Sequence, residues 1–268
     1  MPKTLYVDTT KCLACRGCEV ACKQWNGLKA DLRPMKGFYQ TKEGYAPQTY
    51  TLVNMRELPT DDGGVRWLFA KRQCMHCAEA TCMMVCPKDA ISRTEEGAVV
   101  IDQDKCIGCG YCAQNCPFEV PQVDQRQNKA FKCTLCADRI ANGLIPACAK
   151  TCPSGAIQFG EREELLEAAR ARLAEIKGLF PHAYLYGEKE VGGAALYLLT
   201  EAPSYYGLPP AGTQVPWQVK FWKYFARPVG EIALGATALV ALAGIFFTYV
   251  AKPKPEQPVA KGGSAHGN

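Results

Sequence analysis

Cysteine is the residue type in this sequence that could do chemistry, and all sixteen cysteines lie between Cys12 and Cys152. They form four groups of four, and groups one and three share the spacing C-x2-C-x2-C-x3-C. In chain order the groups are Cys12, Cys15, Cys18 and Cys22; Cys74, Cys77, Cys82 and Cys86; Cys106, Cys109, Cys112 and Cys116; and Cys133, Cys136, Cys148 and Cys152. With the shared spacing, three nearby thiolates bind one iron–sulfur cubane and the fourth reaches a different cluster. Sixteen thiols would therefore hold four [4Fe–4S] clusters.

Disulfides and zinc are the alternatives for so many cysteines. The N-terminal residues MPKTLYVDTT lack the apolar segment of a secretion signal, so they do not indicate the oxidising compartment that disulfide scaffolds need. Zinc ribbons also use paired C-x2-C elements. A ribbon joins two distant pairs on one ion, however, and gives no role to runs of four cysteines followed by proline, as at Pro87, Pro117 and Pro153. Group one has Lys23 in place of this proline, which weakens the match there without affecting ligation.

Internal repeats indicate which groups share clusters. Asp8 and Lys11 precede group one at the offsets at which Asp102 and Lys105 precede group three, and groups two and four both end in C-P-x-x-A-I. A two-cluster ferredoxin has a C-P-x-x-A-I half, a hairpin and a V-x-D-x-x-K-C half, and residues 74–116 keep that order. Groups four and one contain the same halves in reversed chain order. The second ferredoxin-like unit would thus be closed by segments from opposite ends of the cysteine region, with the first unit nested inside it.

This pairing predicts one set of four ligands for each cluster. Site 1 would use Cys12, Cys15, Cys18 and Cys152; site 2 Cys22, Cys133, Cys136 and Cys148; site 3 Cys74, Cys77, Cys82 and Cys116; and site 4 Cys86, Cys106, Cys109 and Cys112. Because every ligand position is cysteine, nothing calls for a three-iron or Rieske-type centre.

Other candidate residues give weaker signals. His76 could donate an N–H bond to a cluster sulfur, although an exposed histidine is the simpler interpretation. His182 and His266 have no evident partners, and Met55, Met75, Met83 and Met84 are expected to pack around the clusters. The sequence contains no nucleotide-binding glycine motif, no nucleophile with a base and no carboxylate pair, so we expect a non-catalytic subunit. A net charge of +5 is too small to imply nucleic acid.

The C-terminal region contains one candidate membrane span. Residues 232–251 carry no charge, and twenty helical residues span about 30 Å, the thickness of a bilayer core. We therefore predict a transmembrane helix over 229–251, preceded by the interfacial aromatics Trp217, Phe221 and Trp222. Three basic residues lie on each side, so charge does not choose an orientation. The Pro- and Gly-rich residues 252–268 are expected to be disordered.

The predicted fold class is α+β: two pseudo-symmetric bacterial 2[4Fe–4S] ferredoxin-like units, rich in loops, followed by one transmembrane helix. Residues 1–28 with 128–160 would form the outer unit and 74–127 the inner unit. Segment 29–73 would be an inserted hairpin, with strands on either side of PTDDGG. Region 161–228 would contain an amphipathic helix, in which Leu165, Leu166, Ala169, Leu173 and Ile176 recur at helical spacing and Gly178 follows as a C-cap.

The sequence resembles the beta subunits of membrane-bound formate dehydrogenases. The resemblance covers roughly residues 3–251 and is carried by LYVDTTKCLACRGCEVACKQWNGL, QCMHCAEATC, CIGCGYCAQNCPF, FKCTLCADRI and YGEKEVGGAALYLL. The cysteine framework alone is shared with subunits of many molybdopterin oxidoreductases and some membrane hydrogenases. An equivalent ferredoxin subunit of such a complex is the alternative.

The resemblance implies a complex of three kinds of subunit. A large subunit with a molybdenum or tungsten bis-pterin would oxidise formate, this subunit would carry electrons along its clusters, and a membrane b-type cytochrome subunit would pass them to quinone. The resemblance also implies a single-pass protein of the cell inner membrane, anchored in the lipid bilayer. Its cluster domain would be periplasmic, exported with a partner that bears a twin-arginine signal.

Overall fold

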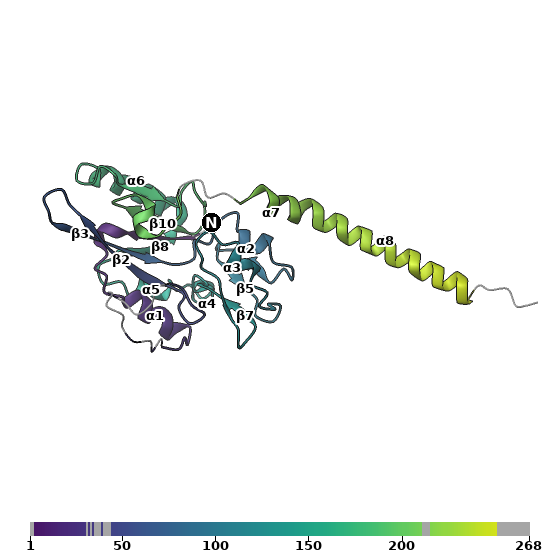
Figure 1. Cartoon of the computed structure of the whole chain (residues 1–268). Coiled ribbons are helices and arrows are strands. Elements are labelled where there is room, and N and C mark those ends of the chain that lie inside the picture. Colours follow the sequence, from purple (N-terminus) through teal and green to yellow (C-terminus); the bar gives the residue numbers. More distant parts are fainter. Residues whose placement is uncertain are drawn as a thin grey trace, which may run out of the picture. The chain divides into compact units, whose positions relative to one another are not determined.

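The computed structural model describes residues 3–30, 32, 34, 39, 44–210 and 215–250 (Figure 1). The predicted disordered tail, 252–268, lies outside the described residues. The chain divides into two compact units, Met1–Val219 and Lys220–Asn268, which are considered separately below. The mixture of helices and strands, with an apolar helix at the C-terminal end, confirms the predicted fold class.

A four-stranded sheet with the order β8-β1-β10-β9 supports the first unit. Its strands are β1 (Lys3–Asp8), β8 (Ile157–Glu161), β9 (Tyr184–Tyr186) and β10 (Ala195–Leu199). Successive side chains of a strand point to opposite faces. Leu5 and Val7 therefore face the core that contains the cysteines, while Tyr6 faces helix α6 (Arg162–Ile176). The sheet thus separates the cysteine-rich core from its covering helix.

Helix α6 confirms the predicted amphipathic helix. Leu166, Ala169 and Ile176 are buried against the sheet, and Leu165 and Leu173 pack beside them. The helix ends at the C-cap residue Lys177 rather than at Gly178. The N–H groups of Leu179 and Phe180 both bond to the carbonyl of Ile176, and this turn stops the helix without a left-handed glycine.

Three hairpins connect the cysteine groups. The predicted hairpin around PTDDGG is confirmed as β2 (Leu52–Pro59) paired with β3 (Val65–Arg72). Shorter hairpins join β4 (Ile91–Arg93) to β5 (Val99–Ile101) and β6 (Gln122–Asp124) to β7 (Lys129–Phe131). Each pair is antiparallel, so each hairpin returns the chain to the region from which it left.

The β1–β8 and β4–β5 strand pairs have the same register, residue by residue, relative to their cysteine groups. Val7 lies opposite Ile157 and Ile101 lies opposite Ile91. The next residue of each pair forms the same hydrogen bond, from Asp8 N to Ala156 O at 2.8 Å and from Asp102 N to Ala90 O at 2.7 Å. The first pair joins opposite ends of the cysteine region and the second lies within one hairpin. The strands therefore pair segments from opposite ends of the cysteine region in the same register as segments within one hairpin.

Short helices follow the cysteines of each group. They are α1 (Gly17–Trp25), α2 (Thr81–Met84), α3 (Tyr111–Gln114), α4 (Ala137–Ala141) and α5 (Ala147–Lys150). Helix α1 of group one contacts α5 of group four, and α2 of group two contacts α3 of group three. The helix contacts therefore repeat the pairing that the strands make.

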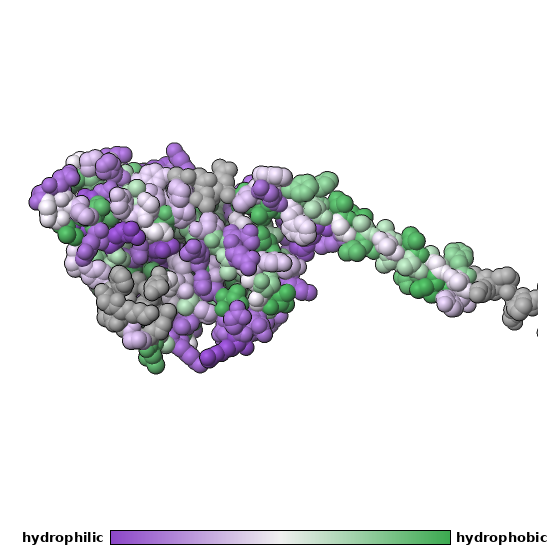
Figure 2. All heavy atoms as spheres, viewed as in Figure 1, coloured by the Kyte–Doolittle hydropathy of each residue, from purple (hydrophilic) through white to green (hydrophobic). Residues whose placement is uncertain are grey.

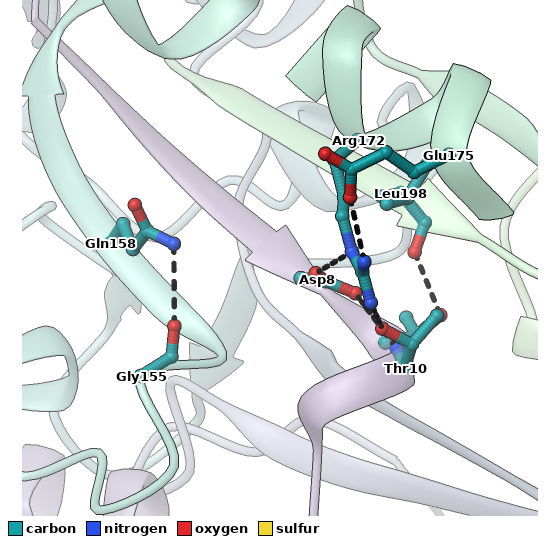
Figure 3. Close-up of polar contacts among 8 residues, drawn as sticks. Asp8, Thr10, Gly155, Gln158, Arg172, Glu175 and Leu198 are labelled. Atoms are coloured by element: carbon teal, nitrogen blue, oxygen red, sulfur yellow. Dashed lines mark hydrogen bonds and ion pairs between the residues drawn. The ribbon is translucent and has the colours of Figure 1, made fainter. Parts of the chain in front are cut away.

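Asp8 fixes the end of β1 just before the first cysteine. It is fully buried, and its carboxylate accepts a 2.9 Å bond from Thr10 N at the start of the 3-10 turn η1 (Thr9–Lys11). Arg172 of α6 lies 3.5 Å from the same carboxylate and 2.8 Å from that of Glu175 (Figure 3). The same view includes the bond from Gln158 Nε2 to Gly155 O, at the start of β8. These contacts tie the entry to group one to the sheet and to α6.

The second unit is one continuous apolar helix. Residues Trp217–Tyr249 pass through α7 (Trp217–Phe221), the π-turn η3 (Trp222–Ala226), α8 (Arg227–Ile245) and the π-turn η4 (Phe246–Val250). The helix is long and apolar enough to cross a membrane, and none of its most apolar window is buried. Apolar residues are concentrated along it (Figure 2). The helix begins at Trp217 rather than at residue 229. The aromatic residues assigned to a membrane-proximal segment form its first turns.

Gly193 allows a close approach between the YGEKEVGG segment and the group-two loop. An added Cβ at Gly193 would lie 2.4 Å from Met75 O and 2.7 Å from His76 O. We expect Gly193→Ala to destabilise the fold by about 1–3 kcal/mol, because the backbone atoms it meets must shift. At roughly 2–4 °C per kcal/mol, thermal unfolding followed by circular dichroism would detect this change. Gly178→Ala is the matched control, since a Cβ there meets nothing within 4 Å. Equal midpoints for the two variants would contradict the packing argument.

Candidate metal centres

All four cysteine groups begin with the same backbone turn. The residue two places after the first cysteine has a positive φ in each group: 52° at Ala14, 47° at His76, 67° at Gly108 and 56° at Leu135. This conformation is uncommon for residues other than glycine, so its recurrence marks a geometry that the surroundings enforce. At Gly108 no side chain fits, because a Cβ would lie 2.4 Å from the Asn128 carbonyl.

The turns direct backbone N–H groups at sulfur. His76 N lies 3.4 Å from Cys74 Sγ, and Leu135 N lies 3.4 Å from Cys133 Sγ. The N–H groups of Ala90 and Ala130 approach the sulfurs of Cys86 and Cys106 at 3.3 and 3.4 Å. Donors of this kind stabilise the thiolate form, which is the form that binds metal.

Three cavities are each lined by one of the predicted ligand sets. The thiols of Cys12, Cys15, Cys18 and Cys152 surround one space, which is site 1. Those of Cys22, Cys133, Cys136 and Cys148 surround a second at site 2, and those of Cys86, Cys106, Cys109 and Cys112 a third at site 4. The other lining residues are mostly apolar at sites 1 and 4, whereas Thr51, Lys71 and Gln73 line site 2. Ile91 and Ile101, the strand pair described above, line the space at site 4, and their counterparts Val7 and Ile157 line that at site 1.

The fourth predicted set is also brought together. Burial is the main reason that the pKa of the Cys77 thiol is raised, and the neighbouring sulfurs of Cys74, Cys116 and Cys82 raise it further. Cys74 and Cys116 act in the same way on Cys82, whose pKa burial raises to about 12. The thiols of site 3 are thus close enough to interact electrostatically.

Buried thiols of this kind suit a polynuclear metal group. Burial raises the pKa of Cys112 to about 11 and those of Cys18 and Cys133 to about 12. Metal ligation requires deprotonated sulfur, so a positive metal core must supply the charge that stabilises these thiolates. Within the described residues, no three His, Cys, Asp or Glu side chains converge on one point that a single ion could occupy. Tetrahedral zinc would need four sulfurs about 2.3 Å from one centre.

The four sites form a series. Lys71 lines the spaces at both site 1 and site 2, and the sulfur of Cys74 at site 3 contributes to the raised pKa of Cys133 at site 2. Cys112 at site 4 contributes in the same way to the raised pKa of Cys82 at site 3. The exposed cysteines are Cys15 at site 1 and Cys109 at site 4, while all four thiols of site 2 are buried. The order is therefore 1, 2, 3, 4, with exposed ends.

The structure corrects the expectation for His76. Its side chain is fully buried rather than exposed, and its Nδ1 accepts a 2.9 Å bond from Val99 N. The proton is therefore assigned to Nε2, which is buried and has no hydrogen-bond partner among the described residues. Burial first, and then the charges of Lys132, Arg93 and Lys71, hold the pKa of His76 well below its usual range. His76 is a neutral core residue of the group-two loop.

The other secondary candidates differ in outcome. Met55, Met75 and Met83 belong to or pack against hydrophobic clusters that contain cysteines, as expected, whereas Met84 is half-buried outside those clusters. His182 lines a surface hollow with Tyr184 and Tyr205, apart from the cysteines. His266 lies outside the described residues.

Sequence analysis missed two buried lysines beside the sites, Lys71 and Lys132. Lys71 lies in β3 three residues before Cys74, and Lys132 follows β7 directly before Cys133, so nearness to the cysteines was the available signal.

Comparison with known proteins identifies the family. A family profile described as a 4Fe-4S dicluster domain matches residues 65–162. The "Formate dehydrogenase iron-sulfur subunit" of Haemophilus influenzae is 38% identical over 243 residues, which are 88% of this chain and 78% of that protein. The "Formate dehydrogenase, nitrate-inducible, iron-sulfur subunit" of Escherichia coli is 36% identical over 91% of this chain and 83% of its own length.

A third relative matches over nearly its whole length. The "Formate dehydrogenase 2 subunit beta (cytochrome c-553)" of Nitratidesulfovibrio vulgaris is 36% identical over 214 residues, 77% of this chain and 97% of that protein. The relatives confirm the predicted resemblance to formate dehydrogenase beta subunits, and the matched domain confirms clusters of the [4Fe–4S] type. The chain therefore belongs to the family of formate dehydrogenase iron–sulfur subunits and is an electron-transfer subunit rather than a catalytic one.

Proposed function

We propose that this chain carries electrons through four [4Fe–4S] clusters held at sites 1 to 4. The observation that supports this best is the serial order of the four thiol sets, with exposed thiols only at sites 1 and 4. All four thiols of site 2 are buried and none at site 3 is exposed, so clusters there would be more shielded from water, which is one of the factors that set cluster potentials. Electrons would enter at one exposed end and leave at the other.

The protein's own residues prepare the sites in three ways. Left-handed turns aim backbone N–H groups at sulfur, and apolar strand residues exclude water. The β1–β8 and β4–β5 pairs bring Cys152 to site 1 and Cys86 to site 4. The iron–sulfur group supplies a reversible one-electron couple when bound. No side chain needs to donate or accept a proton for this task.

We further propose that a molybdenum or tungsten bis-pterin subunit oxidises formate and donates the electrons. A membrane b-type cytochrome subunit would accept them and reduce quinone. Support comes from the names of the relatives, which are subunits of formate dehydrogenases. The apolar helix Trp217–Tyr249 would place this chain beside a membrane partner.

The proposed location is the cell inner membrane, with a single pass and a periplasmic cluster unit. The apolar helix supports the membrane anchor. The side of the membrane is supported by the family resemblance, in which the cluster domain is exported with a twin-arginine partner.

A structural role for the clusters is the second candidate function, in which they would hold subunits together without passing electrons. Redox titration separates the two roles. We expect the anaerobically purified complex to show four clusters on this chain that are reduced reversibly between the potentials of formate and quinone. Clusters that stay oxidised throughout this range would favour the structural role.

Site membership is tested by pairs of cysteine variants. We expect Cys152→Ser to alter the electron paramagnetic resonance signal that Cys12→Ser alters, because both thiols line the space at site 1. Cys86→Ser is the matched control: it also replaces the last cysteine of a group, but it should alter the signal of Cys106→Ser at site 4. If Cys152→Ser instead alters the signal that responds to Cys133→Ser, the assignment of sites 1 and 2 is wrong.

The anchor is tested by truncation. A chain that ends at Pro216, expressed with its partners, should lose its own attachment to the bilayer because the apolar helix is removed. After mild dissociation of the complex, flotation with lipid vesicles measures whether this subunit is still bound to the membrane. A chain truncated after Val250 is the control and should float with the vesicles. If the shorter chain also floats, the anchor lies elsewhere.

A further inference from the structure

Two lysines are buried in the cysteine core. The exposed fractions of Lys71 and Lys132 are 1% and 3%. In the part of the chain that the structure describes, no carboxylate forms an ion pair with either ammonium group. A buried charge without compensation is strongly destabilising. Something other than a side-chain carboxylate must therefore balance these two ammonium groups.

Lys71 points at the thiols of two sites. It lines the spaces at site 1 and site 2, and its Nζ donates a hydrogen bond to Gln73 Oε1. The thiols of Cys18, Cys22, Cys133 and Cys148 line the same spaces as Lys71. The sulfur ligands of sites 1 and 2 are therefore the groups that compensate its charge.

Lys132 faces a different site. Its Nζ lies 3.8 Å from Cys74 Sγ and donates to the carbonyls of Val99 and Cys133, the latter at 3.0 Å. Lys132 thus serves site 3.

The two lysines are placed reciprocally. Lys71 lies three residues before Cys74, a ligand of site 3, but it lines sites 1 and 2. Lys132 lies one residue before Cys133, a ligand of site 2, but its ammonium group contacts site 3. Counted from these cysteines, Gln73 is the counterpart of Lys132, and Lys71 donates to Gln73. One ammonium group therefore reaches each ferredoxin-like unit from the strand that leads into the other.

We propose that Lys71 and Lys132 raise the reduction potentials of the clusters they face, Lys71 at sites 1 and 2 and Lys132 at site 3. An added electron makes a thiolate-ligated cluster more negative by one charge, and a fixed cation in a low-dielectric core stabilises that reduced form. At site 4, Lys88 lines the space but is exposed, and Lys129 donates to the carbonyl of Cys106 at 2.7 Å but is only half-buried. Neither is buried in the way that Lys71 and Lys132 are. This inference rests on the proposed ligand sets and goes beyond them by assigning the residues that tune the potentials.

The test is a redox titration of the intact complex followed by electron paramagnetic resonance. Lys71→Met removes the charge and keeps most of the volume. We expect it to lower the ratio of reduced to oxidised cluster about tenfold or more at a fixed potential for two clusters, which is a shift of about 59 mV for a one-electron couple. Lys71→Arg keeps the charge and should stay close to the wild type. Lys132→Met should lower one cluster potential more than the others. That cluster should be one whose potential Lys71→Met leaves nearly unchanged. Lys177→Met, at an exposed position, is the control for a lost charge far from the core.

The iron content and the number of electron paramagnetic resonance signals distinguish the possible failures from one another. Wild-type chain with far fewer than sixteen irons would refute the ligand proposal itself. Four intact clusters with unshifted potentials in both Met variants would overturn the role of the lysines alone. Loss of iron in a Met variant, with unshifted potentials in the clusters that remain, would show a purely structural role and would also overturn the inference.

Discussion

Strand β1 lies antiparallel to β8, and this ladder brings together chain segments about 150 residues apart. Val7 pairs with Ile157, five residues before Cys12 and five residues after Cys152. Without this ladder, no strand pairing would hold the thiol of Cys152 beside those of Cys12, Cys15 and Cys18. The four thiols surround one space. The ladder is held by buried apolar residues and by Asp8, whose carboxylate bonds to η1 and pairs with Arg172.

The same geometry occurs in the inner unit at a lower entropic cost. There, β4 and β5 are joined by a tight turn, so Ile91 and Ile101 meet within one hairpin. Closing a long loop costs more entropy than closing a short one, although the cost grows slowly with length. In the outer unit the sheet offsets that cost, because β10 pairs with the other edge of β1 and α6 covers its far face. The C-terminal part of the first unit is therefore what stabilises the outer pair of sites.

Local patterns in the sequence were enough to predict the β2–β3 hairpin, α6 and the cysteines that line common spaces at sites 1, 2 and 4. Cysteine spacing and the repeats around it are short-range signals, and covalent geometry limits how a C-x2-C segment can fold. Burial depends on contacts from distant segments, which is why His76 was wrongly expected to be exposed and why Lys71 and Lys132 were missed. The start of the apolar helix was also misplaced, because Trp217 and its aromatic neighbours suit both an interface and a helical turn.

Iron positions in the complex provide the most direct test of the account. Anomalous scattering at the iron absorption edge, recorded from crystals of the anaerobically purified complex, locates each cluster without reference to the chain. The account predicts four four-iron peaks on this subunit, with Cys152 beside the peak at Cys12, Cys15 and Cys18. Single-atom zinc peaks, or a peak that joins Cys152 to Cys133, Cys136 and Cys148, would contradict it.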